Sequence, residues 1–342
     1  MLGCVIHGRG DLRVEELAVP EPGPGQALVA VRYGGVCGSD LHYWRHGGVG
    51  DFRLREPMVP GHEVVGTVVA YGSPGTPGPA VGTAVAVHPA TPCGVCPECV
   101  DGRANVCRDT RYLGSAARFP HVQGAFAGRV VVPAAQLRPL PEGLGRRRAA
   151  LAEPLSVALH AVRRAGDVSG RHVLVTGAGP LGCLVVAAAR AAGAARVTAT
   201  DLLPGALRYA ESAGADVVVR ADDPGDPGWP DEVDVAVEAS GAAAGLDTCL
   251  RLVRRGGVVT QLGMLPPGPS PFAGNLVVSR EIELRGAFRF GPEFDEALAL
   301  LAARPSFDAL ISAVVPVTEA EYAFALAADR ARSCKVLLDF AG

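Results

Sequence analysis

Three residues of types that bind zinc lie within one short stretch of the chain: Cys37, His62 and Glu63. Cys37 adjoins Gly38 and His62 adjoins Gly61, so both candidate ligands stand beside flexible turns. His62 and Glu63 also begin an apolar run typical of a strand, where neighbouring side chains point to opposite faces. Both could bind one ion only if the backbone bends there, and Gly61 could supply the bend. A His-Glu pair alone is equally typical of an ordinary strand start.

Other polar residues could complete such a site. Ser39 and His42 carry the side chains that a proton relay uses. The stretch from Cys37 to Glu63 is rich in Gly and aromatic residues, and we expect a loop that lines a site. Glu153 precedes Pro154 at the start of a predicted helix, where an acidic residue often serves only as an N-terminal charge. Together these residues predict a catalytic zinc site.

The strongest motif is a group of four cysteines, Cys93, Cys96, Cys99 and Cys107, in a C-x2-C-x2-C-x7-C arrangement. Four thiolates this close can surround Zn²⁺ and leave no open position, which is typical of a structural site. Iron–sulfur ligation uses similar spacing, but the chain shows no other redox motif. A zinc-ribbon nucleic-acid module is disfavoured by the acidic balance of the chain. We therefore predict structural zinc.

A glycine-rich turn, Gly177-Ala178-Gly179-Pro180-Leu181-Gly182, follows an apolar strand at 172–176 and precedes a helix at 183–192. A second strand at 196–200 ends at Asp201. This is G-x-G-x-x-G in the context that binds a dinucleotide, with the pyrophosphate at the helix N-terminus. Asp201 would accept hydrogen bonds from the ribose hydroxyls and repel a 2′-phosphate, so NAD is favoured over NADP.

The remaining pattern predicts the elements that position these motifs. Residues 1–36 alternate in short runs and indicate a small all-β unit. From residue 149 onward strands alternate with helices, which indicates a doubly wound parallel sheet. The predicted strands are 216–219, 233–237, 257–262 and 281–286, the predicted helices are 149–165, 293–303 and 319–328, and a last strand at 335–340 is expected to return to the first unit.

Composition narrows the class of protein. A chain of 342 residues favours two domains, and a net charge of −3 gives no footprint for nucleic acid or an anionic membrane. Residues 1–19 carry charges where a signal peptide needs an apolar core, so we expect a cytoplasmic protein. Nine cysteines then indicate metal ligands rather than disulfides.

Lys335 is the single lysine among 32 basic residues, and we interpret this as compositional bias.

Taken together, these motifs resemble the zinc-dependent medium-chain alcohol/polyol dehydrogenases over essentially the whole chain. The matching segments are 37–44, 57–63, the four-cysteine lobe, 152–157 and the glycine turn with Asp201. The resemblance implies an α/β protein with a GroES-like β domain plus a Rossmann doubly wound parallel-sheet domain. It implies a catalytic domain at 1–145 with its structural-zinc lobe at about 88–110, an NAD-binding domain at 146–287, and a segment at 288–342 that returns to the catalytic domain. A homo-oligomer, dimeric or tetrameric, is expected on the same ground.

The resemblance also implies roles. Cys37 and His62 would bind the catalytic zinc with Glu63 as third ligand, while Glu153 would bind the zinc water or exchange with Glu63. Ser39 would receive the proton of the substrate hydroxyl and His42 would pass it to solvent. The expected cofactor contacts are Gly177, Gly179, Pro180, Leu181, Gly182, Asp201, Leu262, Phe288 and Arg289. The expected substrate contacts are Tyr43, Arg111, Phe119, Glu153 and Arg289.

Within the family, the first motif and Glu153-Pro154-Leu155 are similar to the sorbitol dehydrogenase branch. Segments 111–116, 119–122 and 284–290 resemble the members that oxidise the sugar acid L-idonate, and they are the segments expected to line the substrate pocket. Arg289 or Arg111 could pair with the carboxylate of such a substrate. Sorbitol or xylitol and L-threonine are the alternative substrates. A non-catalytic zinc- and NAD-binding protein is the alternative class, although the expected catalytic residues are all present.

Overall fold

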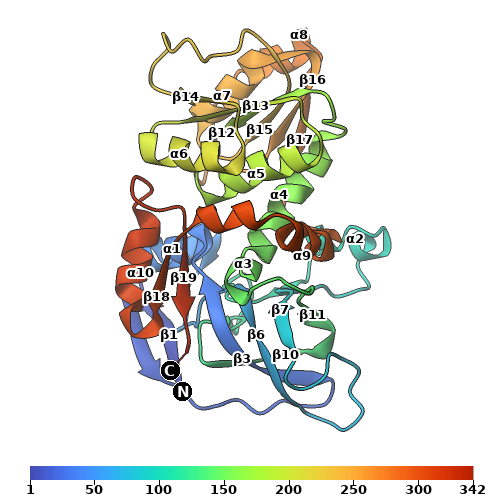
Figure 1. The fold of residues 1–342 in the computed structure, drawn as a ribbon, viewed down its shortest axis with the longest axis vertical. Coiled ribbons are helices and arrows are strands. Elements are labelled where there is room, and N and C mark those ends of the chain that lie inside the picture. The colour runs from blue at the N-terminus through green and yellow to red at the C-terminus, as the bar shows by residue number, and fades with distance from the viewer. Residues whose placement is uncertain (342) are drawn as a thin grey trace.

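Two large β-sheets organise the protein, one in each half of the molecule (Figure 1). The structure is a computed structural model that describes residues 1–341. The first and last parts of the chain build one half, shown in blue, cyan and red, and the middle of the chain builds the other. Both described ends of the chain belong to the first half, where β1 begins at Leu2 and β19 ends at Asp339 (Figure 1). The predicted α/β fold class is confirmed.

The sheet of the first half has the strand order β11–β7–β6–β3–β19–β18, and β10 also pairs with β3. Its seven strands are β3 (Gln26–Gly35), β6 (Glu63–Tyr71), β7 (Ala84–Val87), β10 (Arg129–Pro133), β11 (Leu137–Pro139), β18 (Ile311–Pro316) and β19 (Lys335–Asp339). The last strand, β19, runs antiparallel to β3 and places Leu337 opposite Gly35. This pairing brings the last strand of the chain next to the end of β3, which leads directly to Cys37.

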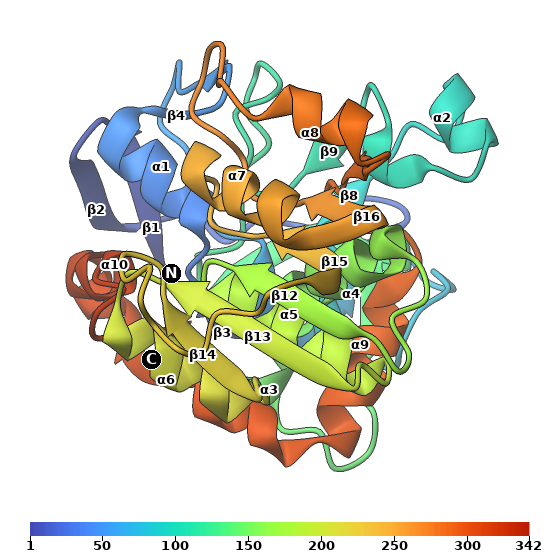
Figure 2. The same ribbon diagram turned by 90° about the horizontal axis from the view of Figure 1, so that it is seen from above.

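Short elements complete this half. The ribbons are β1 (Leu2–Gly8) with β2 (Asp11–Glu16), β4 (Gly48–Val49) with β5 (Phe52–Arg53), and β8 (Ala90–Thr91) with β9 (Arg111–Tyr112). The helices are α1 (Gly38–His46), α2 (Pro97–Val100), η1 (Ala104–Val106), η2 (Ala134–Gln136), α3 (Arg146–Ala149), α9 (Glu293–Ala303), η3 (Pro305–Leu310), η4 (Val317–Glu319) and α10 (Ala320–Ala328). The lobe that carries α2 projects from the body in both views (Figures 1 and 2).

The second sheet is parallel throughout, in the order β14–β13–β12–β15–β16–β17. Its strands are β12 (His172–Thr176), β13 (Arg196–Asp201), β14 (Val217–Arg220), β15 (Val233–Glu238), β16 (Val253–Gln261) and β17 (Glu283–Gly286). The helices beside it are α4 (Ala152–Ala165), α5 (Pro180–Ala191), α6 (Pro204–Ala213), α7 (Ala243–Leu252) and α8 (Gly274–Ser279). Seen from above, helices cover both faces (Figure 2).

Alternation along β12 shows why this sheet needs two helical layers. Val173 and Val175 belong to the core shared with α4, α5 and α6, whereas Leu174 belongs to the core shared with α7. Because successive side chains point to opposite faces, a strand with apolar residues on both faces must be covered on both sides. No helix among residues 1–341 combines the length and the apolar character needed to cross a membrane.

Three expectations about local structure need correction. The stretch after Cys37 is the helix α1 and not a loop, because the Asp40 carboxylate accepts the Cys37 N–H and caps the helix start. The helix predicted at 149–165 begins at Ala152, after the separate short helix α3. The strand predicted at 257–262 begins earlier, at Val253, and passes through two glycines.

Candidate active site

Cys37, His62 and Glu63 come together as predicted from their types. Each offers one ligand atom, and these atoms all lie within 4.8 Å of one another. Cys37 stands at the N-terminus of α1, Glu63 is the first residue of β6, and His62 directly precedes it. Gly61 has a φ of 95°, so the predicted bend is present directly before His62 and Glu63, and it lets both side chains face one point. Sulfur, nitrogen and oxygen donors in this number fit Zn²⁺ with an open fourth position.

Asp40 joins the two elements that carry these residues. It is fully buried, and its carboxylate accepts the Cys37 N–H at 2.9 Å and the Gly61 N–H at 3.1 Å. One of its oxygens also lies 4.0 Å from Nδ1 of His62. Burial raises the pKa of Asp40, although His62 and the two backbone bonds act against that shift. Asp40 lies within the matching segment 37–44, but the sequence analysis assigned it no role.

Lys335 lies on the other side of Glu63. Its Nζ donates to both carboxylate oxygens, at 2.8 and 2.7 Å, and to the Val36 carbonyl at 3.1 Å. Burial lowers the pKa of Lys335, but Glu63 and Cys37 raise it more, so the ammonium stays charged. The scarcity of lysine stays an interpretation about composition, but Lys335 itself has a structural role that the sequence analysis did not assign. Its signal was a single lysine, at the start of the last strand, in a chain that otherwise uses arginine.

Glu153, on α4, faces the site from the opposite half. Its Oε1 accepts the Tyr112 hydroxyl at 2.6 Å, and the Tyr112 ring lies edge-on to His62 with centroids 5.6 Å apart. The Arg289 guanidinium covers the same ring at 4.7 Å. Among residues 1–341, the group with ligand atoms within 4.8 Å contains Glu63 and not Glu153. Geometry thus favours Glu63 as the third ligand. The sequence analysis did not assign Tyr112 to the site. Alternation along β9, where Arg111 is exposed and Tyr112 is buried, was the signal that could have identified it.

The predicted proton relay lies on α1. Ser39 and His42 are separated by one helical turn and so share a face of that helix. His42 is exposed to solvent. Burial, His46 and Arg330 lower the pKa of His42, which favours the neutral ring that can accept a proton. In the described part of the chain, no direct hydrogen bond joins the two side chains.

A cavity of about 320 Å³ adjoins Tyr112, and its lining includes His88, Asn105, Thr110 and Arg289. The Thr110 hydroxyl is buried and has no hydrogen-bond partner among residues 1–341. Arg289 has a φ of 54°, in the left-handed region, and within the same range no carboxylate forms an ion pair with it. Arg289 and Thr110 therefore line one mostly apolar cavity beside the zinc-type site, and the Arg289 guanidinium brings a positive charge to it.

The other predicted substrate residues are placed differently. Tyr43 is buried, and its hydroxyl accepts the Ala116 N–H at 3.0 Å. Phe119 is 57% exposed and packs under Arg55 at 4.3 Å. Arg111 is exposed on β9. Of the predicted contacts, the structure brings Glu153 and Arg289 to the Tyr112 side of the site, while Arg111 and Phe119 lie at the surface.

The four predicted structural ligands, Cys93, Cys96, Cys99 and Cys107, also offer ligand atoms that all lie within 4.8 Å of one another. Sγ of Cys107 accepts the Cys93 and Asp109 N–H groups, each at 3.3 Å. Burial raises the pKa of Cys107, but these bonds and the neighbouring thiols lower it to about 7. N–H groups directed at sulfur favour the thiolate, which is the form that binds metal.

The prediction that the cysteines are metal ligands does not hold for all nine of them. Cys4, Cys183, Cys249 and Cys334 are buried in the apolar cores. They behave as small apolar side chains rather than as metal ligands.

The glycine turn lies at the carboxyl end of β12. Gly177 has a φ of 88°, and a Cβ there would lie 2.6 Å from backbone atoms of Ser240. Gly179 caps α5, which begins at Pro180 and Leu181, and Gly182 packs against the Gly177 carbonyl. Asp201 accepts the Ala178 N–H at 2.8 Å and the Leu203 N–H at 2.9 Å. The turn and the acid therefore occupy the positions that a dinucleotide requires.

The strand order reverses between β12 and β15, which is the switch point where open parallel sheets bind ligands. Leu262 follows β16 at the same edge and is 8% exposed. Phe288 is 43% exposed, and its carbonyl accepts the Asn105 amide at 3.0 Å.

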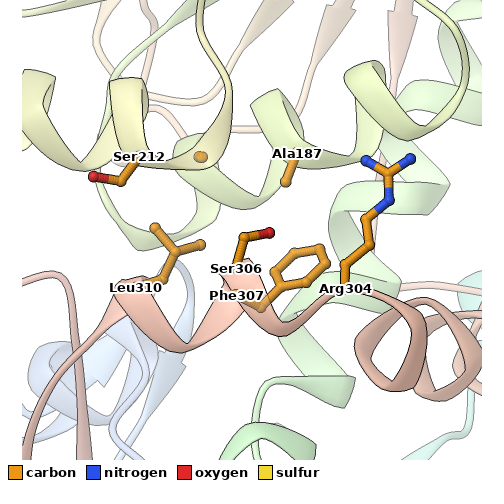
Figure 3. Close-up of a pocket in the computed structure, with 7 residues that line it drawn as sticks. Ala187, Ser212, Arg304, Ser306, Phe307 and Leu310 are labelled. Atoms are coloured by element: carbon orange, nitrogen blue, oxygen red, sulfur yellow. The ribbon is translucent and has the colours of Figure 1, made fainter.

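A second, much smaller cavity lies between α5, α6 and η3, and Figure 3 shows Arg304, Ser306 and Phe307 facing Ala187 and Ser212. Its volume of about 20 Å³ is comparable to one water molecule. None of the predicted site residues lines it, so it is not the substrate pocket.

Comparison with known proteins agrees with this geometry. Residues 23–142 match the alcohol dehydrogenase GroES-like domain, and residues 180–303 match the zinc-binding dehydrogenase family. The fold and its two zinc-type sites define an NAD(P)-dependent zinc dehydrogenase, and the chain belongs to the zinc-binding alcohol dehydrogenase family. The family resemblance and the zinc and NAD(P) cofactors are thereby confirmed.

Individual relatives are similar over nearly their whole length. L-idonate 5-dehydrogenase (NAD(P)(+)) of Escherichia coli K12 is 39% identical, with 98% of each chain covered. Sorbitol dehydrogenase of Gallus gallus is 34% identical, with 98% of this chain and 96% of that protein covered. The crystal structure of the Escherichia coli L-idonate 5-dehydrogenase superposes with a TM-score of 0.92 at 38% identity, covering 99% of this chain and 97% of that one.

Proposed function

We propose that the protein oxidises a secondary alcohol of a sugar acid with NAD⁺, and that its substrate is L-idonate, which would become 5-dehydro-D-gluconate. The observation that carries this proposal is Arg289, a cation without a carboxylate partner among residues 1–341, in the cavity beside Tyr112. A sugar acid brings the carboxylate that such a guanidinium binds, whereas a neutral polyol does not. The name of the Escherichia coli relative supports the same substrate.

Cys37, His62 and Glu63 would hold the catalytic ion, and the four cysteines near α2 would hold the structural ion. A zinc ion with an open position acts as a Lewis acid that lowers the pKa of a bound hydroxyl. Lys335 fixes the Glu63 carboxylate, and Asp40 fixes Cys37 and His62 relative to each other. Glu153, held by Tyr112, would lie near the exchangeable position without being a permanent ligand.

The proton of the substrate hydroxyl would pass to Ser39. His42 would then carry it to solvent, because the ring is exposed and its pKa is lowered. Their placement one turn apart puts both side chains on one face of α1, close to its N-terminus.

The second candidate substrate class is a neutral polyol such as sorbitol or xylitol. Sorbitol dehydrogenase of Gallus gallus, at 34% identity, favours it. The choice depends on whether the Arg289 cavity binds a carboxylate or only hydroxyl groups.

A homo-oligomer is the proposed assembly. The edge strand β17 leaves one row of backbone groups unpaired and exposes Leu284. Val95 and Val100 on the projecting lobe are 81% and 73% exposed. Light scattering should give a mass of at least twice the chain; a monomer at micromolar concentration would contradict the assembly.

The function is tested by NADH formation from NAD⁺ and L-idonate. The wild-type protein should turn over, and Cys37→Ser should lose activity together with one zinc per chain. Cys4→Ala, a core cysteine on β1, is the matched control and should keep both zinc ions and activity. A Cys37→Ser protein as active as the control would contradict the assignment of this site.

A further inference from the structure

Glu238 is a buried carboxylate at the carboxyl end of β15, where it has no part in the chemistry proposed above. It is 0% exposed, and no cation pairs with it within the described chain. Burying an unpaired charge is costly unless hydrogen bonds replace the lost water. Glu238 accepts these bonds from two separate segments, one after β15 and one at the end of β16, and so connects the two.

The first segment is the turn after β15. The Ser240 N–H donates to Oε1 of Glu238 at 2.7 Å, and the Ser240 hydroxyl donates to the same oxygen. The Gly241 N–H lies 3.1 and 3.2 Å from the two oxygens. Gly241 has a φ of 69°, so this turn depends on a left-handed residue held in place.

The second segment follows β16. The Gln261 amide donates to Oε2 of Glu238 at 2.6 Å and to the Gly263 carbonyl at 2.6 Å. The Leu262 and Gly263 N–H groups donate to the Glu238 carbonyl, each at 2.9 Å. A Cβ at Gly263 would lie 2.5 Å from Oε2, so the backbone approaches the carboxylate as closely as only glycine allows.

These segments stand next to the glycine turn, across the switch point of the sheet. Thr176 lies opposite Glu238 in the parallel register, and Gly177 packs against the Ser240 backbone. Asp201 at the end of β13 marks the adenosine side, and the turn after β12 marks the pyrophosphate. A dinucleotide laid along this edge would therefore place its nicotinamide half over the ends of β15 and β16.

We propose that Glu238 is a positioning residue for the nicotinamide half of the dinucleotide. Its carboxylate joins the Ser240–Gly241 turn and the Leu262–Gly263 segment into one fixed wall of the crevice. The inference rests on the proposed function, because it requires that the crevice bind NAD(H). It assigns to Glu238 no contact with the reacting atoms.

The test compares two ligands in the zinc-loaded protein: NADH, and ADP, which lacks the nicotinamide half. Glu238→Gln puts an amide N–H₂ where only acceptors fit, because four donors already point at this position. The Kd for NADH should rise at least about tenfold, or about 1.4 kcal/mol. The Kd for ADP should stay within about twofold.

Asp216→Asn is the matched control. Asp216 accepts the Val197 N–H at 2.7 Å at the opposite edge of the same sheet. This variant should lower the thermal midpoint and leave both Kd values unchanged. If Glu238→Gln does not fold, Ser240→Ala removes one of the four donors and should weaken NADH alone, by about threefold.

An unchanged NADH Kd in the folded variant, or an equal loss for NADH and ADP, would overturn the role of Glu238. A wild-type protein that binds neither ligand would instead overturn the proposed function. The two failures are therefore distinguishable in one set of titrations.

Discussion

Lys335 and Glu63, which are 272 positions apart in the chain, form a buried ion pair in which Nζ lies 2.8 and 2.7 Å from the two carboxylate oxygens. Both side chains are almost inaccessible, at 4% and 0%. The pair joins the last strand, β19, to the start of β6, where the metal ligands lie. Glu63 thus has a cation of its own, and Zn²⁺ would be a second.

Lys335→Met leaves the Glu63 carboxylate buried without that cation. Breaking a buried pair from one side costs about 3–5 kcal/mol, so the chelated variant should lose that much unfolding free energy. Zn²⁺ should restore more stability to the variant than to the wild type, because only in the variant does it supply the missing positive charge. Urea unfolding with and without zinc measures both effects.

Arg32→Met is the control for this variant. Arg32, on β3, pairs with Asp339, which lies on β19 like Lys335. In this pair the two side chains are 35% and 23% exposed. Pairs of this kind contribute at most about 1 kcal/mol. Equal losses in the two variants would show that Lys335 makes only an ordinary ion pair.

The sequence predicted the parts of the site that depend on local spacing. The four cysteines, the glycine turn and Asp201 lie within short segments whose geometry follows from the chain itself. Lys335 could not be assigned in this way, because its partner Glu63 is reached only through the pairing of β19 with β3. Long-range strand pairing is not encoded in any local pattern.

The same limit explains Tyr112 and α1. Tyr112 obtains its role from Glu153 on α4 and from Arg289 after β17, two elements far away in sequence. The helix α1 was mistaken for a loop because its sequence is polar and begins with glycine, whereas Asp40 stabilises its start through a cap. The spacing of Cys37 and Asp40 in the sequence could have indicated the helix cap, but the burial of Asp40 could not be predicted from the sequence.

The structural-zinc lobe should bind its ion independently of the catalytic site. Cys107→Ser removes the sulfur that accepts two backbone N–H groups, so the variant should lose one zinc per chain and unfold at a lower temperature. The other zinc should remain, because Cys37, His62 and Glu63 are untouched. Metal analysis by mass spectrometry checks this; loss of both ions would show that the sites are coupled.

Cofactor preference should depend on Asp201. Asp201→Ser removes the negative charge that opposes a 2′-phosphate while retaining an oxygen for the Ala178 N–H. The ratio of kcat/KM for NAD⁺ to that for NADP⁺ should fall by at least about tenfold. Asp222→Ser, on the exposed loop after β14, should not change the ratio. A wild type that uses both cofactors equally would contradict the role given to Asp201.

His88 should make stability depend on pH. Burial, together with Arg138, lowers the pKa of His88 to about 4, while an unfolded histidine titrates near 6.5. Below pH 6.5 the unfolded chain gains a proton that the folded chain does not, so stability present above 6.5 is lost as pH falls toward 4.

His88→Gln should remove this loss, which is about 2 kcal/mol between pH 7 and pH 4.5 after allowance for partial solvation of the ring. Urea midpoints of the two proteins at matched zinc content give the difference. The half-buried His88 ring packs against Phe290 and Phe294. Parallel pH profiles of the two proteins would contradict a neutral imidazole at this position.

The central claim is that a carboxylate is recognised at Arg289, and it is tested most directly by kcat/KM for L-idonate and sorbitol in the wild type and in Arg289→Ala. L-Idonate should be the better wild-type substrate with NAD⁺. The variant should lose at least about tenfold on L-idonate and much less on sorbitol, because only the sugar acid loses a charge partner. A wild type that prefers sorbitol, or an equal loss on both substrates, would contradict the account.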